Sequence, residues 1–380
     1  MTGSADPPRV AFVLGLATGG TASHVAALAA GCLEAGLDVS LLGPALTLEL
    51  VGQPGRNSAA VKAYRVPVTD RLRPGSAAAA VTALRSAFAA SRPDVVHAHG
   101  VRAGALAVLA IGSMGRRHRP ALAVTVHNAP PDGRAAGLVY GALEQICARR
   151  ADLALCASAD LLARMRRLGA SGAQQFDVAP EPLKTPSAQE IATARADIGA
   201  GDRPVLLTVG RLARQKGLDV LIAAAARWPD RAPQPRIVIA GEGPLAAGLR
   251  AQASQVGADV LFLGARQDVP ALLAVADVVI VPSRWEARAL ILQEAMRSGR
   301  PIVATNVGGT PELTGGDSAV LVPPEDPAAL AAAVLNVLDD PVLGARLGEA
   351  ASTRSTSFPT QKDGVNAAVS IYTKLANGRS

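Results

Sequence analysis

Short apolar runs that end at a glycine, a histidine or another polar residue recur along the whole chain and alternate with helical segments. Each run has the length and composition of a buried strand. Regular alternation of strand and helix predicts an α/β fold, with parallel sheets covered by helices on both faces. The expected strands are 9–14, 39–42, 94–100, 121–126 and 151–156 in the first half, and 205–209, 236–240, 260–263, 278–281 and 302–305 in the second.

The two sets of strands indicate two domains, which a chain of 380 residues can hold. The boundary between them falls where Pro180, Pro182 and Pro186 crowd together among polar residues. We therefore expect an N-terminal domain over 1–184, a C-terminal domain over 185–357 and a closing segment over 358–380 that contains a helix at 360–375.

The sequence indicates in which cellular compartment the protein is found. The three cysteines, Cys32, Cys147 and Cys156, form no Cys-x-x-Cys pair and no metal-like cluster, which is typical of buried thiols in a reducing compartment. The uncharged apolar run near 103–115 is too short to span a bilayer. The N-terminal residues carry no signal-peptide pattern. We therefore expect a cytoplasmic protein.

The charge of the chain lies on its first half. Residues 1–184 hold 19 Lys and Arg against 12 Asp and Glu, whereas residues 185–380 hold 19 of each. A basic half attracts phosphates, and an anionic membrane on the cytoplasmic face is one candidate partner. Simple solubility explains the charge equally well. Nucleic acid is disfavoured, because no aromatic residues interleave with the basic clusters 115–119, 149–150 and 164–167.

The stretch 278–313 reads as strand, loop, helix and strand, with the helix expected over 287–297. Glu286 lies at the loop-to-helix junction, and Glu294 follows eight residues later. On a helix they would stand about 12 Å apart, too far for the roughly 5–10 Å of a hydrolytic carboxylate pair. A ligand with both phosphate and hydroxyl groups would suit a helix N-terminus that carries carboxylates. Alternatively Glu286 only complements the helix dipole and Glu294 is solvated.

The spacing of Glu286 and Glu294, followed by Glu-Ala-Met, Gly-Arg-Pro-Ile-Val-Ala-Thr and Val-Gly-Gly-Thr-Pro-Glu, resembles the donor-site signature of retaining GT-B glycosyltransferases of family 4, glycosyl transferases group 1. The resemblance implies two Rossmann-like domains facing across a cleft, with the last helix crossing back to the first domain. It implies that Glu286 contacts donor-sugar hydroxyls and that Glu294 binds the ribose. Backbone amides of the loop would hold the diphosphate. Here that loop departs from the Gly-containing family pattern and consists of Ala287, Arg288, Ala289 and Leu290, so Arg288 could itself reach a phosphate.

The segment 210–217 follows a strand and opens a helix, the place where phosphates bind. It is no Walker A loop, because Gln215 and Gly217 stand where glycine and Ser or Thr belong. Arg211 and Lys216 bracket the loop and could neutralise a diphosphate, although an exposed basic loop is the alternative. The segment is similar to the family's diphosphate loop. The family resemblance adds Gly241, in a Gly-x-Gly-Pro turn, and Arg266 to the expected donor-binding residues.

Strand-end residues of the first half lie where ligands collect in parallel sheets. Gly19 and Gly20, with His24, resemble the family loop that faces the donor phosphates and the acceptor. His127 matches the family histidine that touches the donor sugar near the reacting carbon. The other strand-end histidines, His97 and His99, read more simply as structural hydrogen-bonders, with His24 and His99 kept as acceptor-side candidates.

No Asp-x-Asp pair occurs in the sequence, so we expect no metal and no cofactor, with cationic side chains neutralising the diphosphate instead. The resemblance implies transfer of a sugar from a UDP- or GDP-linked donor to an acceptor hydroxyl with retention of configuration. The acceptor class, whether glycan, lipid or small molecule, stays open. Two alternatives are a nucleotide-sugar epimerase and a catalytically silent sugar-nucleotide-binding or scaffold protein.

Overall fold

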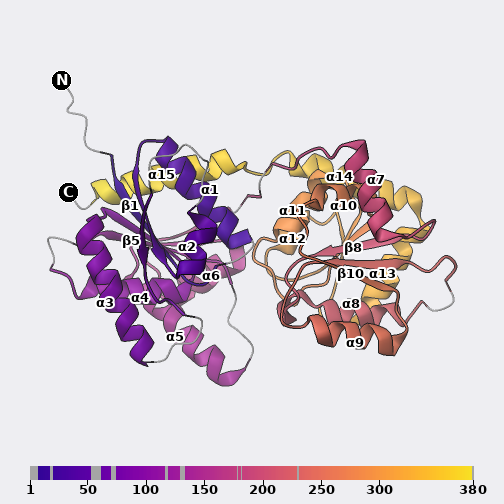
Figure 1. Cartoon of the computed structure of the whole chain (residues 1–380), viewed down its shortest axis with the longest axis horizontal. Helices are drawn as coiled ribbons and strands as arrows, with labels where there is room; N and C mark the ends of the chain where they lie inside the picture. The colour runs from indigo at the N-terminus through magenta and orange to yellow at the C-terminus, as the bar shows by residue number, and fades with distance from the viewer. Residues whose placement is uncertain are drawn as a thin grey trace. The chain divides into compact units, whose positions relative to one another are not determined.

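The computed structural model describes residues 7–17, 20–52, 61–69, 74–115, 119–128, 133–177, 179–180, 182–228 and 231–378 (Figure 1). The chain forms two compact units. The first consists of residues 1–179 together with 359–380, and the second of residues 180–358. The chain thus leaves the first unit shortly before the expected boundary after residue 184 and returns to it for its last helix.

The first unit contains a parallel sheet of seven strands in the order β3-β2-β1-β4-β5-β6-β7. Its strands are β1 Arg9–Leu14, β2 Asp38–Gly43, β3 Lys62–Arg65, β4 Val95–His99, β5 Ala121–Val126, β6 Leu153–Cys156 and β7 Ala173–Gln175. Its helices are α1 Gly20–Glu34, α2 Ala45–Val51, α3 Pro74–Ser91, α4 Val101–Gly112, α5 Arg134–Arg150, α6 Ala159–Arg167 and α15 Gln361–Asn377.

The second unit contains a parallel sheet of six strands in the order β10-β9-β8-β11-β12-β13. Its strands are β8 Val205–Val209, β9 Arg236–Ala240, β10 Val260–Gly264, β11 Val278–Val281, β12 Ile302–Thr305 and β13 Val320–Val322. Its helices are α7 Ala188–Ile198, α8 Leu218–Ala225, α9 Ala246–Val256, α10 Val269–Val275, α11 Leu290–Arg297, α12 Thr310–Thr314, α13 Pro327–Asp339 and α14 Pro341–Ser355.

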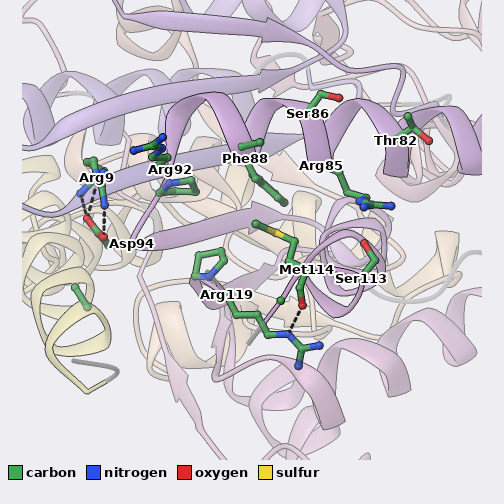
Figure 2. Close-up of a pocket in the computed structure, with 15 residues that line it drawn as sticks. Arg9, Thr82, Arg85, Ser86, Phe88, Arg92, Asp94, Ser113, Met114 and Arg119 are labelled. Carbon is green, nitrogen blue, oxygen red and sulfur yellow. Dashed lines mark hydrogen bonds and ion pairs between the residues drawn. The ribbon is translucent and has the colours of Figure 1, made fainter. Parts of the chain in front are cut away.

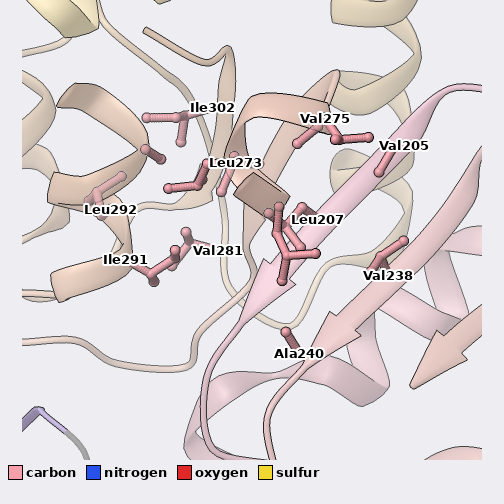
Figure 3. Close-up of a cluster of buried hydrophobic side chains, with 14 of the residues drawn as sticks. Val205, Leu207, Val238, Ala240, Leu273, Val275, Val281, Ile291, Leu292 and Ile302 are labelled. Carbon is pink, nitrogen blue, oxygen red and sulfur yellow. The ribbon is translucent and has the colours of Figure 1, made fainter. Parts of the chain in front are cut away.

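Alternate residues of each strand in the second unit enter different cores, because successive side chains of a strand point to opposite faces. Leu207 packs with α7, α10 and α11 on one face of the sheet, and Figure 3 shows this cluster. Its neighbour Leu206 packs with α8, α9 and α13 on the other face. Burial on both faces explains why the strands read as unbroken apolar runs.

The predicted α/β fold with parallel sheets is confirmed, and one helix start is corrected. Helix α11 begins at Leu290 rather than at Ala287. The loop before α11 is held by contacts described below.

The closing helix α15 belongs to the first unit. Tyr372 and Ala368 are fully buried in its core beside Phe12 and Leu28. At the crossing with α1, a Cβ built on Gly31 would lie 2.4 Å from a methyl carbon of Val365, so only glycine allows the two helices to approach this closely.

The three cysteines are buried and free, as predicted. Within the described residues, no single helix is both long and apolar enough to cross a bilayer. Only α13 and α14 taken together pass that test, and they meet at a bend of 100°.

Candidate functional site

The strand order of the second unit reverses between β8 and β11, which lie side by side although three helices and two strands separate them in sequence. Parallel α/β sheets bind ligands at such a switch point, beyond the carboxyl ends of the strands. The loops that leave β8 and β11 carry Lys216 and Glu286, two of the residues predicted from the sequence. The topology therefore brings the two predicted loops together.

Lys216 and Glu286 form an ion pair in which Nζ and Oε1 lie 2.5 Å apart. The Ser283 hydroxyl donates to the same carboxylate oxygen at 2.6 Å. Among the described residues, Oε2 of Glu286 has no hydrogen-bond partner. An ammonium group has three N–H donors. The pair therefore keeps N–H donors and one carboxylate oxygen for a ligand.

Two glycines allow the loops to approach. Gly217 adopts a left-handed φ of 61°, and a Cβ there would lie 1.9 Å from the carbonyl oxygen of Pro282. Gly308 has a φ of 52°, and a Cβ there would lie 1.9 Å from the carbonyl oxygen of Glu286. The next residue, Gly309, donates its N–H to that oxygen at 2.9 Å. Glycine is required at both positions, because backbone fills the space of a side chain.

Arg284 links the two loops through its side chain and its backbone. Its guanidinium makes two bonds with the Asp219 carboxylate, at 2.8 and 2.7 Å, and a third to the carbonyl of Arg214 at 2.7 Å. Its N–H donates to the carbonyl of Gln215 at 2.7 Å. The fork-shaped guanidinium is suited to such paired bonds. Arg284 thereby holds the turn that carries Lys216 against the loop that carries Glu286.

The same contacts explain why α11 starts later than predicted. Glu286 is bound through its side chain to Lys216 and Ser283 and through its carbonyl to Gly309. The residues up to the N-cap Ala289 stay outside the helix. Glu286 therefore lies in a loop and Glu294 in α11, so the spacing of about 12 Å expected for one helix does not apply.

Arg288 packs within the second unit. Its guanidinium lies over the Phe358 ring, 5.8 Å from the centroid, and 4.0 Å from Oε1 of Glu312. Its side chain is only 8% exposed. The structure thus places Arg288 in the packing of the second unit, between flanking residues, Ala287 and Ala289, that are buried. Direct reach of Arg288 to a phosphate, as the sequence suggested, stays a prediction.

Of the remaining residues predicted to bind the donor, some are exposed and others already form contacts within the fold. Arg211 follows β8, is exposed and makes no ion pair within the described part of the chain. Gly241 follows β9 beside this loop, and its N–H donates to Gly264 at 2.7 Å. Arg266 pairs with Asp268 at 2.6 Å and with Asp197 at 2.9 Å. Arg211 is therefore available to a ligand, whereas Arg266 already serves the fold.

The first unit gathers histidines at the carboxyl ends of its strands. His99 Nδ1 and His127 Nε2 lie 3.2 Å apart, and the centroids of the two stacked rings lie 5.5 Å apart. The ring centroid of His24, a residue of α1, lies 6.1 Å from the centroid of each of these two rings. Burial, followed by the charge of His127, lowers the pKa of His24 to about 3, and burial lowers that of His127 to about 4. These rings are neutral at pH 7. Gly20 begins α1, while Gly19 and the basic residues 116–118 lie outside the described residues.

His97 is the structural hydrogen-bonder that the sequence suggested. Its Nδ1 lies 2.6 Å from the Tyr372 hydroxyl and its Nε2 lies 2.5 Å from the Thr125 hydroxyl. It therefore ties α15 to the sheet. By contrast, Nε2 of His24 and Nε2 of His99 are buried and unpartnered within the described residues. The described residues contain no group of three His, Cys, Asp or Glu side chains suited to hold a metal ion.

Sequence reasoning missed Ser283, Arg284 and Asp219, which position the ion pair. Ser283 and Arg284 directly follow an apolar strand, which is a usable signal for a ligand-facing loop. The partnership of Arg284 with Asp219, 65 residues away, leaves no mark in the local pattern.

Two family profiles match the chain. One, described as glycosyl transferase 4-like domain, matches residues 19–180. The other, described as glycosyl transferases group 1, matches residues 203–340, which include Lys216, Glu286 and Glu294. The first match ends one residue beyond the N-terminal segment of the first unit, and the second match lies within the second unit.

Relatives and solved structures agree with the profiles. The chain is 32% identical to glycogen synthase of Mycobacterium tuberculosis over 299 residues, covering 76% of this chain and 70% of that protein. Sucrose-phosphate synthase from Thermosynechococcus elongatus superposes with a TM-score of 0.80 at 22% identity, covering 98% and 100% of the chains. Anabaena HepE in complex with UDP-glucose superposes with a TM-score of 0.80 at 21% identity, covering 97% of this chain and 99% of that chain. The protein therefore belongs to the glycosyl transferases group 1 family and is a glycosyltransferase of the GT-B fold.

Proposed function

We propose that the protein transfers a sugar from a nucleotide-diphosphate sugar to an acceptor hydroxyl, with retention of configuration and without a metal ion. One observation carries the donor part of this proposal, the ion pair of Lys216 and Glu286 beyond the switch point of the second sheet. It joins a cation suited to phosphate with a carboxylate suited to sugar hydroxyls. A nucleotide sugar carries both groups side by side.

The cation and the carboxylate of the pair have different roles in this proposal. The free N–H donors of Lys216, together with exposed Arg211, stabilise the negative charge that grows on the departing diphosphate. The unpartnered Oε2 of Glu286 accepts a hydroxyl of the sugar. Charges held in place before the reaction need no reorganisation, which makes this kind of stabilisation effective. In this proposal, backbone N–H groups at the start of α11, around Ala289 and Leu290, bind the phosphates, as helix N-termini commonly do.

In the proposed reaction, the acceptor oxygen attacks the anomeric carbon from the face that the diphosphate leaves. The bond between that carbon and the phosphate oxygen breaks, and the hydroxyl proton passes to the departing phosphate. Configuration is thereby retained. The role of His127 beside the donor sugar and that of Glu294 at the ribose stay predictions from the family resemblance.

The solved structures support a nucleotide-sugar donor. HepE, a protein of the same fold, was crystallised with UDP-glucose and with UDP. The identity of 21% with that protein is too low to transfer the base or the sugar to this chain. A screen of UDP- and GDP-linked sugars by thermal shift would identify the donor.

The test is loss of turnover in Lys216→Ala and Arg211→Ala. Each should cut kcat by about two orders of magnitude, the scale for removing one preorganised charge stabiliser. Arg214→Ala is the matched control, since Arg214 is an exposed cation in the same turn, two residues before Lys216. Near-normal turnover in both test variants would reject the diphosphate assignment.

A catalytically silent binding protein of the same fold is the second candidate, and the unusual Ala287-Arg288-Ala289 loop favours it. It would show a thermal shift with a nucleotide sugar but no product with any acceptor extract. Turnover above the rate of donor hydrolysis, lost in Lys216→Ala, decides for the enzyme.

A further inference from the structure

Four large apolar side chains are exposed on two neighbouring helices of the first unit, α4 and α5. Leu109 on α4 is 53% exposed, and Leu138, Val139 and Ile146 on α5 are 76%, 54% and 36% exposed. The two helices pack against each other. A single exposed apolar residue is normal on a protein surface. Several of them on adjoining helices indicate a surface that a partner covers.

The exposed residues of α5 lie on one side of the helix, because residues three, four or seven positions apart share a face. The opposite side carries Glu144, Cys147 and Ala148, which are buried in the fold. The outer side consists of exposed residues only, namely Leu138, Val139, Ala142, Gln145, Ile146, Arg149 and Arg150. This side is therefore apolar over most of its length and ends in two arginines.

A groove between the end of α4 and the second half of α5 connects the exposed residues of the two helices. It measures 760 Å³, and Leu109, Ile146, Arg149 and Arg150 are among the residues that line it. The one carboxylate in its lining, that of Asp152, accepts a backbone N–H of β5 at 2.7 Å. Leu109 thus belongs to the same surface as the outer side of α5. We call this surface the α4–α5 face, and it consists of Leu109, Leu138, Val139, Ile146, Arg149 and Arg150.

The three helices α3, α4 and α5 expose no carboxylate. Their one acidic residue, Glu144, is fully buried, and its carboxylate accepts bonds from the Arg164 guanidinium at 2.9, 3.0 and 2.6 Å. The adjoining α6 carries Asp160 in its first turn and three arginines in its last. Figure 1 shows α1 and α15 on the other side of the strands, where they share a core with α2. Each of these three helices exposes one carboxylate, namely Glu34, Glu49 and Asp363.

The charge pattern indicates which partner the α4–α5 face fits. A symmetric dimer formed through this face would bring two sets of arginines into one interface, without a carboxylate on the face to match them. Nucleic acid is disfavoured, because the face carries no aromatic ring that could stack on bases. An anionic bilayer matches both properties, since apolar side chains enter its head-group region and cations meet its phosphates.

We propose that the α4–α5 face docks the protein on an anionic lipid bilayer. The four apolar side chains enter the head-group region, and the two arginines contact the lipid phosphates. Apolar burial and attraction between opposite charges then act together, and salt screens the second of these. The proposal does not rest on the proposed function, because docking requires neither a sugar donor nor turnover.

The test measures co-sedimentation of the full chain with phosphatidylcholine vesicles, with and without phosphatidylglycerol, at low and at high salt. We expect the native chain to pellet with the anionic vesicles at low salt and to bind them less as the salt concentration rises. One test variant removes an exposed apolar side chain from each helix, and the other removes both cations. These variants are Leu109→Ser/Leu138→Ser and Arg149→Gln/Arg150→Gln.

Two control variants make the same kinds of change on the other side of the sheet. Leu46 and Leu50 on α2 are 54% and 51% exposed, similar to the apolar residues of the α4–α5 face, but lie beside Glu49. Lys362 and Lys374 are exposed cations on α15. The controls are Leu46→Ser/Leu50→Ser and Lys362→Gln/Lys374→Gln. All four variants change exposed side chains, and thermal unfolding checks that each one is folded.

We expect each test variant to bind anionic vesicles at least about tenfold more weakly than the native chain. Each basic residue near an anionic surface contributes a factor of about five. An apolar side chain that leaves water contributes a factor of at least about that size. Both control variants should bind like the native chain.

Three results with vesicles would overturn the proposal. The native chain could fail to pellet with anionic vesicles, or a control could lose as much binding as the matching test variant. Loss of the two leucines could also have no effect, which would mean that charge alone explains the adsorption. A dimer that forms in analytical ultracentrifugation and is lost in Leu109→Ser/Leu138→Ser would assign the face to a second copy of the chain and equally overturn the proposal.

Discussion

Lys216 and Glu286 depend on each other for their burial. Their side chains are 23% and 8% exposed, and Ser283 completes the contact at Oε1. Removing one partner of such a pair leaves the other charge partly buried and unmatched, which destabilises the folded state. Activity lost in Lys216→Ala must therefore be read together with the stability of the variant. The loop glycines test the approach of the two loops without removing either charge.

Gly217→Ala should lose activity and stability because its Cβ would meet the Pro282 carbonyl at 1.9 Å. The comparison is Gly257→Ala, which has nearly the same φ, 65° against 61°, but open space around its Cβ. The backbone strain of about 1 kcal/mol is then shared by both variants. Urea unfolding should show Gly217→Ala at least about 2 kcal/mol less stable than Gly257→Ala. Equal stabilities would show that the loops can separate freely.

At the scale of elements, Arg284 and Asp219 connect the loop after β11 with the start of α8. We expect Arg284→Lys and Asp219→Asn each to lower kcat/KM by about tenfold or more, since each loosens the turn that presents Lys216. The double variant should be little worse than either single one, because both break the same contact. A double-mutant cycle on kcat/KM measures this coupling, expected at about 1–3 kcal/mol. Additive effects would mean that the two residues act separately.

The histidine cluster makes the first unit sensitive to acid. His24 and His127 have folded-state pKa values of about 3 and about 4, below the unfolded value of 6.5. The unfolded state therefore binds more protons below pH 6.5, and stability falls as the pH drops from that value toward 4. Each histidine should contribute a slope of about 1.4 kcal/mol per pH unit.

Urea unfolding between about pH 6.5 and pH 5, above the range of most carboxylates, measures this slope. His24→Asn should reduce the slope by about one proton. A stability that does not change over this range would contradict the neutral, buried state of the cluster.

Sequence periodicity predicted the strands because they are buried on both faces and read as apolar runs, as in Val278–Val281. Lys216 and Glu286 became candidates through their positions in loops after parallel strands, where ligand groups collect, together with the family resemblance. It misplaced the start of α11, because Ala287–Ala289 have good helix propensity and only tertiary contacts of Glu286 hold them out of the helix. The pocket between α3 and the segment after α4, which Figure 2 shows, could not be predicted from the sequence, since these segments meet only in the fold.

At the scale of the whole molecule, we predict that turnover persists in excess EDTA. In the proposed function, Lys216 and Arg211 would supply the positive charge that a divalent ion would otherwise bring to the diphosphate. The measurement compares rates before and after chelation, with manganese added back. Full loss restored by manganese would mean that the two cations do not suffice.

The burial of Tyr372 and its bond to His97 have a consequence for how the chain is made. The first unit begins at the first strand of the chain but cannot complete its core until α15, the last helix, has been synthesised. The whole second unit emerges from the ribosome in between. During synthesis, His97 therefore lacks its partner Tyr372, which lies 275 residues downstream, and part of the first sheet stays uncovered until α15 is made.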